Sequence, residues 1–91
     1  MILVHGAMHL DLPTVDSLKG RRRVLNGIKE RLRRMNLSVL DLSGDYVREA
    51  DVAFAYLAHD LRQAAQIRES IRRMMDRHFP EYDYDLEYEE L

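Results

Sequence analysis

The apolar residues of this chain change their spacing several times, and this pattern constrains the fold more than any other feature. They alternate with polar residues near both ends of the chain and recur every three or four positions in two interior stretches. Alternation is typical of a half-buried strand, and the wider spacing is typical of an amphipathic helix. The expected segments are a strand at 1–12, a helix at 18–35, strands at 37–42 and 47–58, a helix at 61–78 and a strand at 82–89.

Local signals mark the starts of both helices. Asp16 or Ser17 can cap the first, and Asp60 with Gln63 three positions on can cap the second. The apolar face of the first helix is expected to comprise Leu18, Leu25, Ile28, Leu32 and Met35. That of the second is expected to comprise Leu61, Ala64, Ile67, Ile71, Met74 and His78. The order β-α-β-β-α-β favours an α+β ferredoxin-like sandwich, with two helices on one face of a four-stranded antiparallel sheet, and we expect residues 1–91 to form one domain.

Composition excludes several classes of protein. Hydrophobic residues make up 46% and charged residues 33% of the 91 residues, as in a globular protein. The absence of cysteine excludes disulfide scaffolds, thiolate zinc sites and cysteine nucleophiles, and it fits a reducing cytoplasm. We expect no membrane span and no signal peptide, since no stretch reaches the ~18 apolar residues that a span requires. A chain this short buries only roughly 60–65% of its unfolded surface, so a homodimer would add burial.

Charge is unevenly distributed along the chain. Residues 1–45 carry eight Lys or Arg and five Asp or Glu, whereas residues 46–91 carry six and eleven, for a net charge of −2. Helical spacing places cationic and polar residues in a stripe that can follow a phosphate backbone. The candidate nucleic-acid-binding residues are Lys19, Arg22, Arg23, Asn26, Lys29, Arg33 and Arg34. The alternative is a solvated helix face, which the overall pI of about 6.1 favours.

One block of this sequence resembles a known family. The segment Leu10-Asp11-Leu12-Pro13, followed by Ser17-Leu18-Lys19-Gly20-Arg21-Arg22-Arg23-Val24-Leu25, resembles the signature of the small bacterial DUF503 or YlxP-like proteins. Residues 38–39 and 50–55 are similar to the second and third strands of that family, whereas the shorter segment Ser43-Gly44-Asp45-Tyr46 replaces a loop in which the family often has an aromatic residue, commonly tryptophan, and a histidine. The resemblance implies a ferredoxin-like fold, self-association and no known enzymatic activity. It also implies a connection with translation, because genes of the family are often found among those for ribosome maturation.

Arg21 and the aromatic residues have structural interpretations. Arg21 falls between Leu18 and Leu25 on the apolar helix face, so we expect an ion pair with a carboxylate of the last strand or with Asp16. The last strand alternates tyrosines with acids, which can form an edge or an interface. The candidate dimer-interface residues are Phe54, Tyr56, Tyr82, Tyr84 and Tyr88. The alternatives for Phe54 and Tyr56 are a place in the core, or stacking on RNA bases from an open sheet face.

Metal and catalytic sites are not expected. His5 and His9 share a strand face, but four strand residues span ~13 Å, which is too far for one ion. His59 and His78 lie at opposite ends of the second helix, and no serine has a recognisable His/Asp setting. Asp11, at the end of the first strand, lies where small nucleases of this topology hold a metal ion, but the Ser-Leu-Lys block fits that family poorly. We therefore expect no enzyme activity and no cofactor.

Two functions follow from these patterns. The leading hypothesis is a non-enzymatic binding protein associated with RNA or a ribosomal subunit through its basic first helix. The alternative is a homodimeric protein-interaction or regulatory module, which binds a protein partner through its sheet face or its acidic last strand. No small-molecule substrate is evident.

Overall fold

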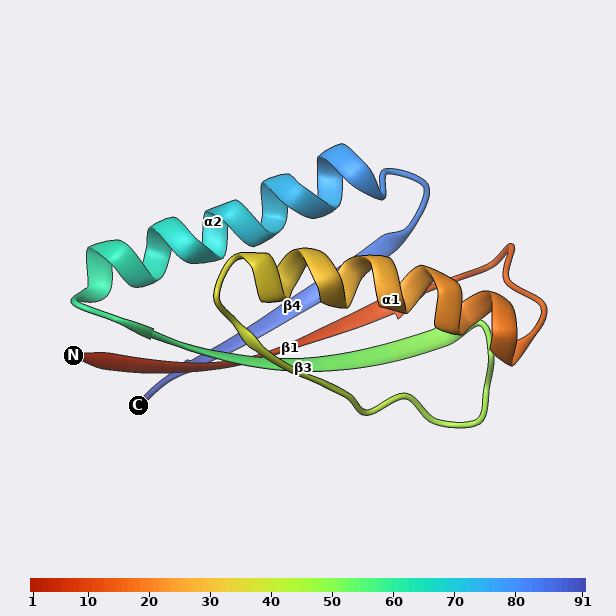
Figure 1. Cartoon of the computed structure of the whole chain (residues 1–91), viewed down its shortest axis with the longest axis horizontal. Helices are drawn as coiled ribbons and strands as arrows, with labels where there is room; N and C mark the ends of the chain where they lie inside the picture. The colour runs from red at the N-terminus through yellow and green to blue at the C-terminus, as the bar shows by residue number, and fades with distance from the viewer.

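The computed structural model describes residues 1–91 and contains the six predicted elements in the predicted order (Figure 1). They are β1 (Ile2–Asp11), α1 (Leu18–Arg34), β2 (Ser38–Asp41), β3 (Glu49–Ala58), α2 (Leu61–His78) and β4 (Asp83–Glu90). The ferredoxin-like fold is thus confirmed. Neither helix is long and apolar enough to cross a membrane.

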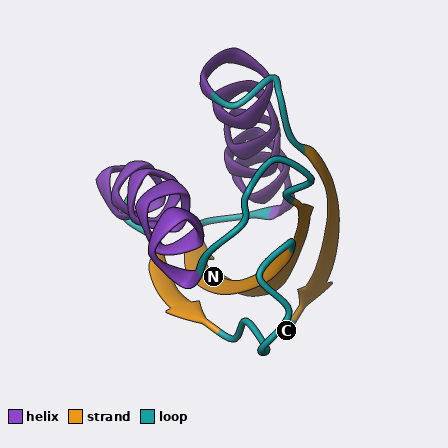
Figure 2. Ribbon diagram, turned by 90° about the vertical axis from the view of Figure 1, so that its right-hand side faces the viewer, coloured by secondary structure: helices purple, strands orange, loops and turns teal.

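The sheet is antiparallel throughout, with the strand order β2-β3-β1-β4. Both helices lie on one side of it, and the other side is uncovered (Figure 2). Each strand therefore has a helix-covered face and an open face, and neighbouring residues alternate between the two. On β1, Val4, Met8 and Leu10 are fully buried beneath the helices, while His5 and Ala7 face the open side.

The core fills the space between the sheet and the two helices. Strand β3 contributes alternate residues from Ala50 to Ala58, all of them buried. The buried residues of α1 are Arg21, Leu25, Ile28 and Leu32, and those of α2 are Ala64, Ile71 and Met75. The predicted helix faces are largely confirmed, but Leu18, Leu61 and His78 are exposed. Leu18 and Leu61, 52% and 61% exposed, are the first residues of their helices, and His78 is the last residue of α2.

Capping residues near each helix in the sequence determine where the helices begin and end. The side chain of Ser17 accepts a hydrogen bond from the Gly20 N–H at 3.0 Å, and that of Asp60 accepts one from the Gln63 N–H at 2.8 Å. Both satisfy amides that have no partner within the helix. Asn36, just past α1, has a φ of 66°, a left-handed conformation that ends a helix.

The middle of β1 contains a glycine that two aromatic rings require. Gly6 pairs with Phe54 on one side and with Tyr88 on the other. The Phe54 ring occupies the space where a Gly6 side chain would lie, and it meets the Tyr88 ring edge-on at 6.0 Å between centroids. The bare backbone at Gly6 thus allows Phe54, the largest fully buried side chain, to pack against β1.

Candidate functional site

Charge is separated between the two layers of the molecule. Of the fourteen Lys and Arg residues, eight lie on α1 and five on α2, so Arg48 alone lies outside the helices. The four strands contain no Lys or Arg, and nine of the sixteen acidic residues lie in them. The helical layer is therefore strongly cationic and the sheet strongly acidic, although the net charge is only −2.

The predicted basic stripe lies at the surface of α1. Six of its seven residues are exposed and Lys29 is half-buried. Lys29 lies near Asp41 at the end of β2. Burial would raise the pKa of Asp41, but hydrogen bonds from Ser43 and the charges of Lys29 and Arg21 lower it below its ordinary value. Arg34 forms an ion pair with Glu30, and the other cations of the stripe have no carboxylate within 4.0 Å. Their charge is available to a ligand.

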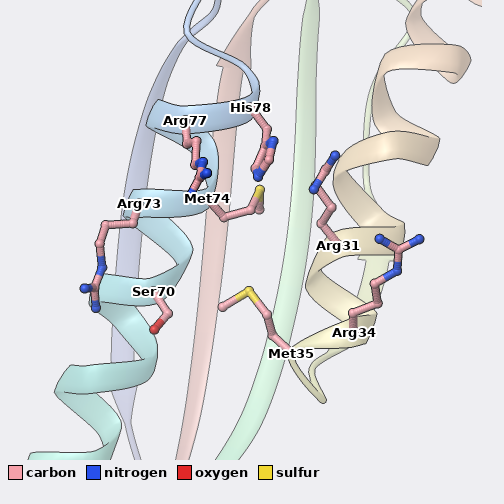
Figure 3. Close-up of a pocket in the computed structure, with 8 residues that line it drawn as sticks. All are labelled: Arg31, Arg34, Met35, Ser70, Arg73, Met74, Arg77 and His78. Atoms are coloured by element: carbon pink, nitrogen blue, oxygen red, sulfur yellow. The ribbon is translucent and has the colours of Figure 1, made fainter.

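A groove between the two helices holds cationic residues that the sequence did not single out. Its volume is about 420 Å³. It is lined by Arg31, Arg34, Met35, Ser70, Arg73, Met74, Arg77 and His78 (Figure 3). Burial, together with the charges of Arg31 and Arg77, lowers the pKa of His78 below its ordinary value. Arg34 was predicted as part of the α1 stripe, but the arginines of α2 join it only through the packing of one helix against the other.

Arg21 has a different partner from the one that its sequence position suggested. Its side chain is buried, and Nη1 donates to the carbonyl oxygens of Tyr46 at 2.9 Å and Glu49 at 3.1 Å. No carboxylate lies within 4.0 Å, so the predicted ion pair is wrong. The reason lies in the strand order, because β4 and its acids occupy the sheet edge opposite β2, whereas Arg21 reaches the connection between β2 and β3.

Phe54 and Tyr56 lie on the covered side of the sheet, which corrects their place in the predicted dimer interface. Phe54 and Tyr56 are 2% and 5% exposed and belong to the core, so neither a partner chain nor RNA bases can reach them. Tyr82, Tyr84 and Tyr88 are half-buried against the core. The Tyr84 hydroxyl donates to Asp76 of α2 at 2.6 Å, and Arg68 of α2 lies 5.1 Å from the centre of the Tyr88 ring.

The open face of the sheet carries leucines and acids instead. Leu3 pairs with Leu57 across β1 and β3, and Leu40 pairs with Ala53 across β2 and β3. These leucines are 39%, 60% and 61% exposed, which is high for large apolar residues on one sheet face. The acidic residues of β4 form a stripe along the sheet edge opposite β2. This is the acidic face that their alternation with the tyrosines predicts.

A mixed cluster lies at one end of this open face, around His9. Its Nδ1 donates to Asp51 at 2.8 Å, and its Nε2 lies 3.7 Å from Asp11. The hydrogen bond with Asp51 raises the pKa of His9. Partial burial opposes this rise, and the charges of Asp51, Asp11 and Glu49 add to it. One ligand atom each from His9, Asp11 and Glu49 lies within 4.8 Å of the others, so these three are the residues that can hold a cation. Asp11 pairs with Glu49 across β1 and β3, so the cross-strand register brings Glu49 into the cluster. The sequence alone pointed only to Asp11 and to the pair of His5 and His9.

These features define a class of protein: a ferredoxin-like α+β protein with a cationic helical layer and an acidic, partly apolar sheet face. The family model described as "Protein of unknown function (DUF503)" matches residues 4–87, and the chain belongs to the DUF503 family. This confirms the family resemblance of the Ser-Leu-Lys block. No curated protein sequence matches the chain.

Solved structures confirm the fold independently. The designed protein Foldit4 is similar over 98% of this chain and 97% of its own, with a TM-score of 0.61 and 15% identity. A Thermus thermophilus protein described as a putative PII-like signaling protein is similar over 98% and 87%, with a TM-score of 0.53 and 10% identity. A designed protein with a ferredoxin fold is similar over 97% and 85%, with a TM-score of 0.54 and 12% identity.

Proposed function

We propose that this protein is a non-enzymatic RNA-binding protein, associated with the ribosome, whose α1 contacts the phosphate backbone. One observation carries the proposal, namely the location of thirteen of the fourteen Lys and Arg residues on the two helices. A phosphate backbone is bound through local cationic surfaces, so the charge of one layer matters more than the net charge of −2.

The geometry of α1 supports this function. A helix of 17 residues is about 25 Å long, which is long enough to follow several phosphates of a strand. Arg22, Lys29 and Arg33 lie along it without carboxylate partners, so binding an anion breaks no ion pair of the protein. The family resemblance adds the connection with translation, which directs the search to ribosomal RNA.

The test is the salt dependence of RNA binding. We would measure fluorescence polarisation of a labelled oligo(U) strand of about 20 nucleotides between about 50 and 200 mM salt. Replacing Arg22, Lys29 and Arg33 with Glu should abolish binding at the higher salt. Because each phosphate contact adds about 0.7 to the slope of log K against log salt, the slope should fall by about 2.

A matched control variant distinguishes the effect of cations located on α1 from the effect of total charge. Replacing Arg48, Arg62 and Arg72 with Glu changes the net charge by the same amount, and all three residues are exposed and lie outside α1. This variant should retain most of the affinity and the slope. Equal loss in both variants would show a non-specific charge effect and would contradict the assignment to α1.

Association with the ribosome is a separate measurement. The tagged protein should co-sediment with a ribosomal subunit at low salt and leave it at moderate salt. The α1 variant should stay at the top of the gradient at both salt concentrations. If the wild-type protein also stays there at both, the ribosomal part of the proposal fails, whatever the oligo(U) result.

A homodimer is the second candidate function, and the open sheet face favours it. Leu3, Leu40 and Leu57 give this face an apolar area that a second copy can cover, with the acids of β4 left at the rim. Light scattering at tens of micromolar should give the mass of two chains, and replacing Leu40 and Leu57 with Glu should give that of one. A wild-type mass of one chain would exclude this candidate.

A further inference from the structure

The groove between α1 and α2 shares only Arg34 with the outer α1 stripe assigned to RNA. In Figure 3, Arg31 of α1 and Arg77 and His78 of α2 come together around Met74, while Arg34 and Arg73 stand at the outer rims. The groove therefore has a cationic end formed by both helices. Met35 lies further along it, so the two methionines provide an apolar lining.

Most of the positive charge of this groove has no carboxylate partner, although the Arg31 guanidinium lies 6.0 Å from the centre of the Phe79 ring. Cations in the last turn of a helix stabilise its negative end, and the last turn of α1 contains three of them, Arg31, Arg33 and Arg34. Arg34 pairs with Glu30, but Arg31, Arg73 and Arg77 have no carboxylate within 4.0 Å. Guanidinium groups that share a groove without a counter-ion repel one another, and an anion bound between them would relieve that repulsion.

The size and lining of the groove indicate what kind of anion fits. Guanidinium groups match phosphate oxygens in pairs of hydrogen bonds. A volume of about 420 Å³ is larger than a phosphate group alone needs and lies in the range of small-molecule sites. Thioether side chains are polarisable and make favourable contacts with aromatic rings, so Met35 and Met74 suit a nucleobase.

We propose that this groove binds a nucleotide, with Arg31 and Arg77 contacting its phosphate and Met35 and Met74 contacting its base. The nucleotide is either free or the 5′-phosphorylated end of an RNA strand, since the recognised chemistry is the same. The proposal does not depend on the outer α1 stripe, because Arg31 and Arg77 are not part of it.

His78 provides a spectroscopic readout of this site. Burial and the charges of Arg31 and Arg77 lower the pKa of this residue in the free protein. A phosphate bound beside these arginines would offset their charge and raise the pKa of His78. The ring proton resonances of His78, followed by NMR over pH, should therefore shift to a higher midpoint when the site is occupied.

The experiment compares four probes by NMR and calorimetry: inorganic phosphate, adenosine, adenosine 5′-monophosphate and a 5′-phosphorylated trinucleotide. We expect the monophosphate to raise the His78 midpoint and to bind at least tenfold more tightly than phosphate or adenosine. A trinucleotide that binds a further tenfold more tightly would identify a strand end as the source, and equal affinity would identify a free nucleotide.

Two variants of equal charge test the residues. Replacing Arg31 and Arg77 with Gln should weaken monophosphate binding at least tenfold, while replacing Arg48 and Arg62 with Gln should leave it unchanged. Binding of adenosine as tight as that of its monophosphate, or an unchanged affinity in the Arg31/Arg77 variant, would overturn the proposal. Phosphate binding as tight as that of the monophosphate would overturn the role of the methionines. None of these outcomes affects oligo(U) binding by the α1 stripe, so the two proposals can fail separately.

Discussion

At the scale of single residues, Gly6 shows how tightly the sheet and the core depend on each other. A methyl group at this position would overlap the Phe54 ring, which is 2% exposed, so the ring would have to shift within the core. Overpacking a core costs about 1–3 kcal/mol. We predict that Gly6→Ala lowers the free energy of unfolding by that amount, as measured by urea denaturation.

Gly44 provides the control for this prediction. A Cβ there would meet no atom within 4 Å, and its backbone is not left-handed. Gly44→Ala should therefore change the free energy of unfolding by less than about 0.5 kcal/mol. If both variants have the stability of the wild-type protein, the packing of Phe54 against bare backbone is not the constraint that we infer.

Two tyrosine hydroxyls of β4 are expected to affect the free energy of unfolding in opposite directions. The hydroxyl of Tyr88 is buried without a hydrogen-bond partner, and burial raises its pKa to about 12. The hydroxyl of Tyr84 donates to Asp76, and burial together with this bond raises its pKa to about 12 as well. An unpaired buried hydroxyl is unfavourable, whereas a paired one stabilises the fold.

The corresponding phenylalanine variants should therefore differ in sign. Tyr88→Phe should raise the free energy of unfolding by about 1 kcal/mol, and Tyr84→Phe should lower it by about 0.5–1 kcal/mol. Thermal denaturation of the two variants beside the wild-type protein measures both effects. A loss of stability in Tyr88→Phe would mean that its hydroxyl has a partner in solution.

For Arg21, the sequence predicts the position of the residue but not its hydrogen-bond partner. Its helical position correctly predicted that it lies on the covered face. Its partner was not predictable, because local spacing does not say which part of the sheet lies beneath the start of α1. The carbonyl oxygens belong to Tyr46, in the connection between β2 and β3, and to Glu49, the first residue of β3, and both become its neighbours only in the folded molecule.

At the scale of elements, all six were predictable because their signals are local. Apolar spacing and the caps Ser17 and Asp60 depend on residues within a turn of each other. The groove between the helices was not predictable, since its arginines lie on different helices and meet only when α1 packs beside α2. The cluster around His9 was missed for the same reason, because its members come from β1 and β3.

The pairing of β1 with β3 makes stability depend on pH through His9. The hydrogen bond with Asp51 raises the pKa of His9 above its ordinary value of 6.5. Protonated His9 therefore stabilises the folded state fully below about pH 6.5, and this contribution is lost as the pH rises through the raised value. We predict that wild-type protein exceeds His9→Gln in stability more at about pH 6 than at about pH 8.5.

The measurement is urea denaturation of both proteins at the two pH values in the presence of a chelator, so that no cation at His9 affects the result. An NMR titration of Asp51→Asn provides the control, since losing this carboxylate should bring the pKa of His9 back toward 6.5. A pH-independent difference between wild-type protein and His9→Gln would contradict the prediction.

At the scale of the whole molecule, the separation of charge between the layers matters more than the total. The helices carry thirteen Lys and Arg residues and three acids, while the strands carry nine acids and no Lys or Arg. Two such layers back to back give the molecule a large dipole, and an anionic surface meets mainly the helical side. Binding to such a surface should therefore follow the charge of the helical layer.

A variant with compensating substitutions tests this directly. Replacing Arg22, Lys29 and Arg33 with Glu, together with Asp85, Glu87 and Glu89 with Lys, leaves the net charge at −2. Those three acids lie on the open face of β4 and are exposed, so folding should be unaffected. We predict that wild-type protein binds phosphocellulose at neutral pH and low salt more tightly than this compensated variant does.

Two further variants, each with one half of these substitutions, distinguish the two surfaces. The first replaces Arg22, Lys29 and Arg33 with Glu, and the second replaces Asp85, Glu87 and Glu89 with Lys. The first should elute without binding, and the second should bind at least as tightly as the wild-type protein because its helical layer is intact. If retention follows net charge alone, the compensated variant elutes at the salt concentration of the wild-type protein and the first and second variants shift by equal and opposite amounts. A loss on reversal of α1 much larger than the gain on reversal of β4 is the result expected when the helical layer is the binding surface. Arg22, Lys29 and Arg33 lie in a layer with ten other cations, whereas three lysines on β4 would be the only Lys or Arg residues of the sheet, and affinity for a phosphate surface rises with the number of cations that contact it together.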